Sequence, residues 1–441
     1  MLNKFSEDVV LNNKKRNMSS LFISVFFICL MPFVHPYLIL LPFAIQIIRM
    51  LRYSHETVLA DVAFLLPFSN LFRLPDGKSL LFILIMIIDI WFFCRRKMKI
   101  NTGMLIIFGL LVYLLFRMGG EYIDYLAIIS GIIFLYFAVD ILTPSISVKI
   151  SKMFVISVLL SSAFGWLFQN ASQITRYLRN TDNDMHMNGV VDFRFQALFS
   201  DPNYFSVCVI IAICFLFLMY SSGEIKALRF YAGAIALFAF GIMTLSKTFF
   251  IVLVICIIAY LLMMFSKKSL YACLGFCVLI GVVLILFNSG KIEALQSIKD
   301  RFESAENLNE LTTGRSDLWK IYLDKTLETS SSFLFGYGFE APLLYNKGSH
   351  NLFLEIFYYT GSLGLIGLVG FIIWVLYTIL NKCLKGAILK LKELSVFIMP
   401  LAFIVFYCSL QGMYQTIFYI EIALVAMGLM IPFTRKANNN E

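Results

Sequence analysis

The strongest constraint on the fold of this chain is its long series of apolar segments, separated mostly by short polar turns. A helix needs roughly 20 mainly apolar residues to cross the hydrocarbon core of a bilayer. Of the 441 residues, 60% are hydrophobic and 14% are charged, whereas soluble domains carry about 25% charged residues. The sequence therefore predicts an all-α polytopic membrane protein with about 12–14 transmembrane helices.

The expected spans follow from the apolar segments, and the first three are the weakest. They lie near 19–34, 36–50, 56–73, 79–94, 103–118, 122–143, 153–169, 204–221, 228–245, 248–265, 270–288, 351–380, 395–411 and 415–433. Lys14, Lys15 and Arg16 precede the first span, which lacks a small-residue cleavage pattern. We therefore expect an uncleaved first span rather than a signal peptide.

Clusters of Lys and Arg recur at alternate ends of these spans, for example at Arg95–Lys97, Lys267–Lys268 and Arg435–Lys436. Short loops rich in Lys and Arg face the cytoplasm, so both termini are predicted to be cytoplasmic. The net charge of +9 is explained by these loops and does not indicate a nucleic-acid partner.

We expect three regions, and the boundary near residue 150 is implied by a family resemblance rather than by the topology. They are N-terminal transmembrane helices at 1–150, a transmembrane core at 151–435 and a cytoplasmic tail at 436–441. The core includes two longer loops that face outward, near 170–203 and 289–350. The nine cysteines lie in or beside apolar segments and show no disulfide or metal spacing, so we expect small buried side chains.

The first outer loop ends in the sequence FRFQALFSDPNYF. Asp201 followed by Pro202 is typical of a helix start, so Asp201 is expected to be a cap. Arg194 is either a solvated or headgroup-facing arginine or a phosphate ligand, since guanidinium binds phosphate through two parallel hydrogen bonds. Lys247 lies in an apolar hairpin, where it either reaches the interface or pairs with an anion.

The second outer loop places Arg315 just before an expected helix start at Ser316 and Asp317. A fixed cation beside free helix N–H groups favours an anion site. Farther along, His350 precedes the span at 351–380, with Ser349 or Asn351 as a plausible cap. The positive end of a helix favours a neutral imidazole, which can accept a proton from a hydroxyl. A structural histidine is the alternative.

Three further features belong to the same region. Glu355 is expected inside the span at 351–380, where a buried carboxylate is a functional candidate. Gly336 and Gly338 form a Gly-X-Gly turn, which is weak evidence for anything more. Glycines at 361, 364, 367 and 370 are expected to allow close helix packing.

Three short motifs, taken with the topology, resemble the O-antigen ligase/polymerase superfamily of bacterial surface-polysaccharide enzymes. They are R-x-x-x-L-F-S-D-P-N-Y-F at Arg194–Phe205, G-R-S-x-L-W at Gly314–Trp319, and a G-x-G turn followed by S-H-N-x-x-L-E at Ser349–Glu355. The resemblance covers residues 150–435, and residues 1–150 match only as a hydrophobic series.

This resemblance implies a membrane glycosyltransferase (GT-C-like) architecture and a donor linked to undecaprenyl pyrophosphate, used at the outer face of the bacterial cytoplasmic membrane. It implies that Arg194 and Arg315 hold the pyrophosphate and that His350 is the catalytic residue. Lys247 stands where the family often has arginine, and Asn351 and Glu355 are candidates for orienting the acceptor. It also implies no metal or cofactor, with membrane lipid and a chain-length regulator protein as partners.

The function expected from the resemblance is a repeat-unit polymerase (Wzy-type) for O-antigen or capsular polysaccharide. One alternative is a ligase that moves the polymer onto lipid A-core or protein. Another is a flippase for the lipid-linked oligosaccharide, whose charges would line a central cavity. The candidate basic residues Arg194, Arg315 and Lys247 lie in outer loops and at one helix mouth, whereas a transport pathway needs charges inside the membrane. Asp61, Asp89 and Asp140 are too few and too scattered to form one, so the sequence favours an enzyme.

Overall fold

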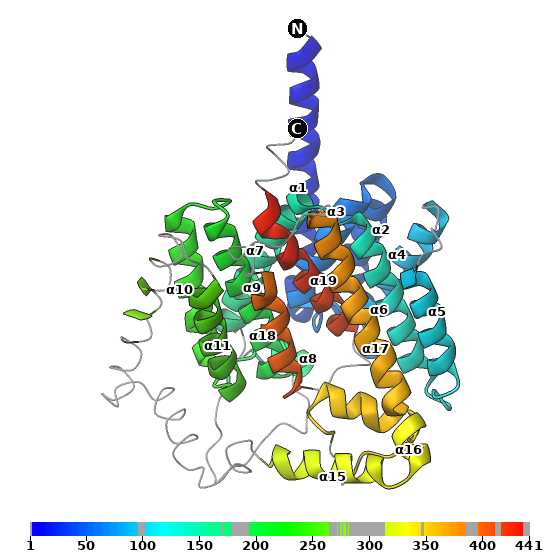
Figure 1. The fold of residues 1–441 in the computed structure, drawn as a ribbon. Helices are drawn as coiled ribbons and strands as arrows, with labels where there is room; N and C mark the ends of the chain where they lie inside the picture. The colour runs from blue at the N-terminus through cyan, green and yellow to red at the C-terminus, as the bar shows by residue number, and fades with distance from the viewer. Residues whose placement is uncertain are drawn as a thin grey trace.

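The computed structural model describes residues 2–95, 102–168, 171–178, 194–263, 314–344, 348–384, 396–410 and 416–434, with short pieces between 271 and 281. Within these ranges the regular structure is helical (Figure 1). The helices of the first half are α1 (Leu2–Val34), η1 (Pro36–Ile39), α2 (Leu40–Arg52), α3 (His55–Leu65), η2 (Leu66–Phe68), α4 (Leu80–Arg95), α5 (Thr102–Leu115), α6 (Tyr122–Ile141), α7 (Pro144–Phe168) and α8 (Ser172–Leu178). Those of the second half are α9 (Pro202–Ser221), α10 (Ala227–Met243), α11 (Lys247–Met263), α15 (Arg315–Leu327), α16 (Ser330–Phe335), α17 (Leu352–Leu384), α18 (Ile398–Tyr407), α19 (Thr416–Met430) and η5 (Ile431–Phe433).

An all-α polytopic membrane protein is confirmed. Four helices are long and apolar enough to cross a membrane: α6, α7, α9 and α17. Shorter apolar helices in α1, α5, α10, α11, α18 and α19 complete the bundle. The expected total of about 12–14 stays a prediction, because most of the span expected at 270–288 lies outside the described residues. The tail at 436–441 and the part of the second loop at 289–313 also lie outside the described residues.

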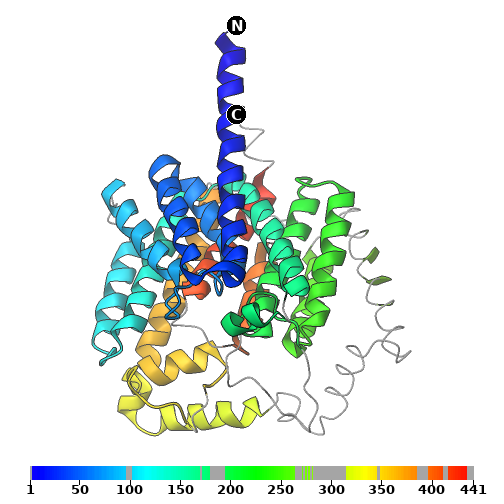
Figure 2. The same ribbon diagram turned by 180° about the vertical axis from the view of Figure 1, so that it is seen from behind.

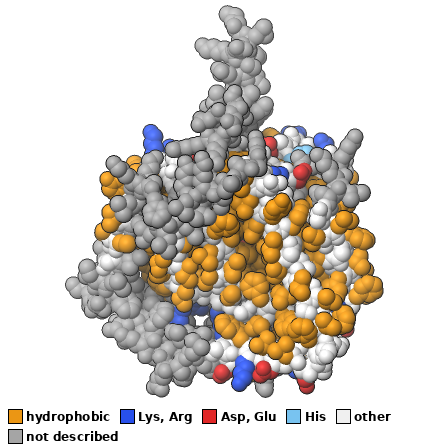
Figure 3. All heavy atoms as spheres, viewed as in Figure 1, with side chains coloured by type: hydrophobic (Ala, Val, Ile, Leu, Met, Phe, Trp, Pro, Cys, Tyr) orange, Lys and Arg blue, Asp and Glu red, His pale blue; other side chains and the backbone are white. Residues whose placement is uncertain are grey.

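The outer surface of the bundle carries an apolar band. Figure 3 shows hydrophobic side chains over the middle of one face, with charged side chains gathered toward its two ends. Large apolar side chains such as Phe108, Ile366 and Tyr377 are about two-thirds exposed. Such exposure across a long face is costly in water and is favourable against lipid tails.

The first two helices form a hairpin because Pro36 starts a new helical segment directly after α1. The imidazole of His35 accepts a hydrogen bond from the Tyr37 N–H at this turn. α2 then packs back along α1, and the Gln46 amide donates to the Ser24 hydroxyl at 3.0 Å. The two separate helices expected at 19–34 and 36–50 are therefore confirmed. The third expected span, at 56–73, is shorter than predicted, since α3 ends at Leu65 and the short η2 (Leu66–Phe68), which contains Pro67, follows it.

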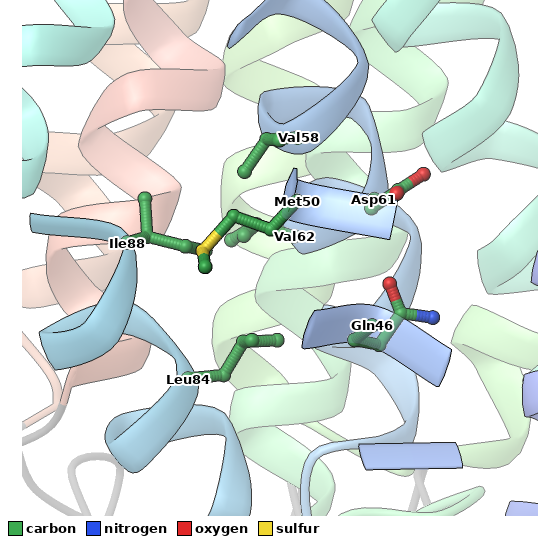
Figure 4. Close-up of a pocket in the computed structure, with 7 residues that line it drawn as sticks. All are labelled: Gln46, Met50, Val58, Asp61, Val62, Leu84 and Ile88. Carbon is green, nitrogen blue, oxygen red and sulfur yellow. The ribbon is translucent and has the colours of Figure 1, made fainter. Parts of the chain in front are cut away.

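A buried ion pair joins α2 to α3. The Arg49 guanidinium donates to both carboxylate oxygens of Asp61, at 2.7 and 2.6 Å, and the two side chains are only 3% and 5% exposed. Figure 4 shows Asp61 and Gln46 beside Met50 and Val58 around a small cavity of about 10 Å³. The polar groups here satisfy one another inside an apolar setting.

The expectation of a single span over 351–380 is wrong in one respect. At Gly361 the backbone has φ 63° and ψ −170°, which breaks α17 into two parts. The part before Gly361 lies across the end of the bundle beside α15 and α16, and only the part after it runs through the bundle (Figures 1 and 2). Glu355 therefore lies in the first part of α17, across the end of the bundle, and not in the part that runs through it as expected.

The break has a tertiary cause. The Tyr337 and Gly338 N–H groups donate to the Tyr358 and Tyr359 carbonyls, each at 2.8 Å, and so use acceptors at the end of the first helical part. A Cβ on Gly336 would lie 2.5 Å from the Gly361 nitrogen. The Gly-X-Gly turn is thus a docking element for α17, which the sequence did not indicate.

One end of the bundle holds all the predicted site residues. α15, α16, the first part of α17 and the starts of α9 and α11 lie at this end, whereas α1 begins and η5 ends at the opposite end (Figures 1 and 2). The division at residue 150, which lies inside α7, stays a prediction, as does the side of the membrane that each end faces.

Candidate anion-binding site

Arg194 is anchored to the turn between α10 and α11. Its Nε donates to the Thr244 carbonyl at 3.0 Å, and its Nη2 donates to the Asn203 side-chain oxygen at 3.1 Å. The same Asn203 oxygen accepts a hydrogen bond from the Ser246 hydroxyl at 2.9 Å. One amide therefore ties Arg194, the start of α9 and the start of α11 together.

Asp201 caps α9 as predicted. Its carboxylate accepts a hydrogen bond from the Asn203 N–H at 2.6 Å, and Pro202 is the first residue of the helix. The pattern works because a short acceptor satisfies an otherwise unpaired N–H, while proline needs no acceptor.

Lys247 is the first residue of α11, immediately after the turn that holds Arg194. On one side Ser246 contacts Asn203, and on the other the Thr248 hydroxyl lies 3.1 Å from the Ser409 hydroxyl. Lys247 is half-buried in this position. The hairpin thus places Lys247 at the helix start, between the segments that carry the two arginines.

Arg315 reaches the same region from the second loop. Its Nη1 donates to the Ser409 carbonyl, which follows the end of α18, at 2.8 Å. Burial lowers the pKa of Arg315, and the nearby charge of Asp201 opposes this change. An arginine keeps its proton under either influence at neutral pH. Arg315 therefore brings a positive charge to the start of α9.

The helix that carries Arg315 begins one residue earlier than predicted. Gly314, with φ 80°, precedes it, and Arg315 rather than Ser316 is its first residue. The Trp319 indole, one turn farther along α15, donates to the Ser349 carbonyl at 2.9 Å. α15 is thereby joined to the residue directly before His350.

His350 stands at the entry to α17 in a left-handed conformation, with φ 49°. Asn351 caps the helix, because its side-chain oxygen accepts hydrogen bonds from the Phe353 and Leu354 N–H groups at 3.1 and 3.2 Å. The predicted cap is confirmed in Asn351. Ser349 is buried and contacts the Asn351 backbone, which fixes the chain on both sides of the histidine.

Glu355 is buried between α17 and α15, 6% exposed. Burial is the largest cause of the raised pKa of Tyr322, and the charge of Glu355 contributes to it. The carboxylate therefore lies near Tyr322 of α15. This position is one turn into the short first part of α17, away from the lipid-facing belt.

The positioning of this region depends on residues of the N-terminal half. The Arg117 guanidinium donates to the Gly336 carbonyl at 2.8 Å, and the Phe339 N–H donates to the Arg117 carbonyl at 2.9 Å. The Tyr113 hydroxyl donates to the Thr360 carbonyl, and the Glu340 carboxylate accepts from the Gly120 N–H. α5 and the loop after it thus hold the Gly-X-Gly turn and the start of α17.

Backbone strain gathers at this end of the bundle. Among the described residues, Ala197, Leu245 and His350 are the non-glycine residues with positive φ, at 49°, 51° and 49°. They lie before α9, in the α10–α11 turn and before α17. Gly165 of α7 permits the first, since a Cβ there would lie 2.6 Å from the Ala197 Cα. Such conformations persist where the surroundings impose them and are frequent at functional sites.

Three cations from three separate segments are linked in this way. Arg194, Lys247 and Arg315 are joined through Asn203, the α10–α11 turn and Ser409, at the starts of α9, α11 and α15. Helix N-termini carry unpaired N–H groups and partial positive charge, so the arrangement favours a polyanion. The sequence missed the residues that hold the cations, namely Asn203, Thr244, Ser246 and Ser409, because their role depends on contacts between distant segments. It missed Tyr113 and Arg117, which hold the start of α17 and the Gly-X-Gly turn, for the same reason.

A comparison with protein-family models matches residues 232–371 to the family described as O-antigen ligase. The match contains Lys247, Arg315, His350, Asn351 and Glu355, and Arg194 precedes it. A search of curated proteins found no match to the chain.

Proposed function

We propose that this chain is a member of the O-antigen ligase/polymerase superfamily and a glycosyltransferase acting on a glycan linked to undecaprenyl pyrophosphate; the family match at residues 232–371 supports this. In the specific form proposed, it joins oligosaccharide repeat units into O-antigen or capsular polysaccharide at the outer face of the cytoplasmic membrane. The lipid carrier suits a site at the end of a membrane bundle.

The observation that carries the proposal is the linked set of Arg194, Lys247 and Arg315 at converging helix starts. A pyrophosphate carries several negative charges in a small volume. Arginine can bind it through paired hydrogen bonds, and helix N–H groups supply further donors. These cations take the role that a divalent metal has in many sugar-nucleotide enzymes.

The proposed reaction is a displacement at the anomeric carbon of the donor sugar. The acceptor hydroxyl oxygen forms the new glycosidic bond as the bond to pyrophosphate breaks. The leaving pyrophosphate takes the electron pair, and Arg194 and Arg315 stabilise its growing charge. His350 accepts the hydroxyl proton on a ring nitrogen. Without a covalent enzyme intermediate, the anomeric centre is inverted.

The polymerase assignment is tested by deletion of the gene and analysis of two glycan pools. Loss of a polymerase leaves at most one repeat unit on the final acceptor. Long polymer stranded on undecaprenyl pyrophosphate in the deletion strain would contradict the assignment.

A ligase is the second candidate, because the matched family is described as O-antigen ligase. The two enzymes share the donor and differ in the acceptor, which is a second lipid-linked repeat unit for a polymerase and a core sugar or protein for a ligase. Stranded long polymer is the result that would identify the ligase.

A further inference from the structure

A carboxylate that the proposed reaction does not use lies buried beneath the cation site. Glu421 of α19 is fully buried and accepts a hydrogen bond from the Tyr407 hydroxyl of α18. Its other oxygen lies 3.9 Å from the Cys208 sulfur of α9. Tyr407 and Cys208 are also buried. A carboxyl group in the apolar part of a membrane protein is costly, so its retention calls for a role.

Tyr407, the partner of Glu421, lies at the end of α18, next to the segment that holds Arg315. Tyr407 is the last residue of α18, and Ser409 follows two residues later, with its N–H donating to the Phe406 carbonyl at 2.8 Å. The Ser409 carbonyl accepts the hydrogen bond from Arg315, and its hydroxyl contacts Thr248 beside Lys247. A shift of the end of α18 would therefore move an anchor of two of the three cations.

A second path joins the same groups. Tyr204 lies in the first turn of α9, which packs against α18, and it is close to both Arg315 and Tyr407. The pair formed by Tyr407 and Glu421 is therefore adjacent to the cation site as well as connected to it through the chain.

We propose that Glu421 is a positioning residue of the pyrophosphate site. Its carboxylate holds the Tyr407 hydroxyl, the hydroxyl holds the end of α18, and Ser409 at that end holds Arg315. The inference rests on the proposed function, because it takes Arg315 to be a ligand of the substrate's pyrophosphate. Glu421 itself does not touch the substrate in this proposal.

The test measures binding and turnover separately, on full-length protein in nanodiscs. Binding of radiolabelled undecaprenyl pyrophosphate is followed by scintillation proximity, and polymer formation is followed with lipid-linked repeat units. The variants are Glu421→Leu, Glu421→Gln, Tyr407→Phe and the double variant of Glu421→Leu with Tyr407→Phe. Glutamine keeps an oxygen that can accept the tyrosine hydrogen bond, whereas leucine does not.

Tyr419→Phe is the matched control. Tyr419 lies two residues before Glu421 on α19, is buried, and its hydroxyl has no hydrogen-bond partner among the described residues. Its loss removes the same atom as Tyr407→Phe without breaking a link to α18.

We expect Glu421→Leu and Tyr407→Phe each to weaken binding by about tenfold. The double variant should be no worse than either single variant, because both remove one interaction. Glu421→Gln and Tyr419→Phe should bind as the wild type does.

Wild-type binding by Tyr407→Phe, additive losses in the double variant, or failure of glutamine to rescue would overturn the positioning role. If Glu421→Leu does not fold, Tyr407→Phe and Glu421→Gln still decide it. A wild type that binds undecaprenyl pyrophosphate but makes no polymer would contradict the polymerase assignment alone. A wild type that does not bind it would overturn both proposals.

Discussion

Arg49, in the N-terminal half of this protein, and Arg194 and Arg315, in the C-terminal half, have different kinds of partner. Arg49, in the N-terminal half, donates to both carboxylate oxygens of Asp61 in the bundle interior. Arg194 and Arg315, in the C-terminal half, donate to the neutral oxygens of Thr244, Asn203 and Ser409. A carboxylate cancels the charge of its partner, whereas the carbonyl and amide oxygens that hold Arg194 and Arg315 fix each guanidinium without adding an opposing full charge of their own.

A buried arginine is not by itself a sign of a ligand-binding site. Its hydrogen-bond acceptors and its position in the bundle distinguish a structural arginine from one that can bind a ligand. Arg49 lies between α2 and α3 inside an apolar setting, which suits a structural pair. Arg194 and Arg315 are half-buried at the end of the bundle, where a ligand can reach them.

The largest effect is expected from a substitution of the proposed catalytic residue, His350. His350→Ala should lower the rate of polymer formation by about 100- to 10,000-fold, the range typical of a lost general base. The rate is measured with lipid-linked repeat units and purified protein, after surface polysaccharide and protein level have been compared in a deletion strain. Wild-type product at wild-type protein level would refute the catalytic role.

The next prediction concerns the structural side. Arg49→Met should destabilise the folded protein by about 3–5 kcal/mol, because it leaves Asp61 buried without its partner. Thermal unfolding in detergent measures this. Adding Asp61→Leu should restore much of the loss, since two apolar side chains can replace a buried ion pair. Folded Arg49→Met should still bind undecaprenyl pyrophosphate. Loss of binding by the folded fraction would contradict a purely structural role for Arg49.

Arg315→Lys tests whether the guanidinium geometry matters at the cation site. Lysine keeps the charge but cannot make two parallel hydrogen bonds to phosphate, so we expect a loss nearly as large as that of Arg315→Ala, about tenfold or more in binding. The same result is expected at Arg194. Recovery of most activity by lysine at either position would mean that phosphate is not bound in this bidentate manner.

The smallest effect is expected for Lys247→Arg. Arginine there should be tolerated within about threefold, because it keeps the charge at the start of α11 and adds donors. Alanine should not be tolerated, because the charge is lost. Equal activity of the alanine variant and the wild type, measured at matched protein levels, would remove Lys247 from the site.

Local signals in the sequence predicted much of this protein correctly. The apolar segments predicted an all-α membrane bundle, since a helix satisfies its own backbone groups in lipid. Asp201 and Asn351 could be assigned as caps because a cap acts on N–H groups only two or three residues away. The sequence could also single out four site candidates, because a cation beside a helix start favours an anion and a histidine there favours the neutral ring. These candidates are Arg194, Lys247, Arg315 and His350.

Tertiary structure alone decided how these residues are held. The break at Gly361 depends on hydrogen bonds from Tyr337 and Gly338, and the placement of Arg315 depends on Ser409, 94 residues away. The sequence around Glu421 does not reveal its role, because that role depends on the hydrogen bond that Tyr407 of another helix donates to it. Such contacts are set by how helices from distant segments pack, so no local pattern encodes them, whereas propensity, capping and hydrophobicity act within a few residues and can be read directly from the chain.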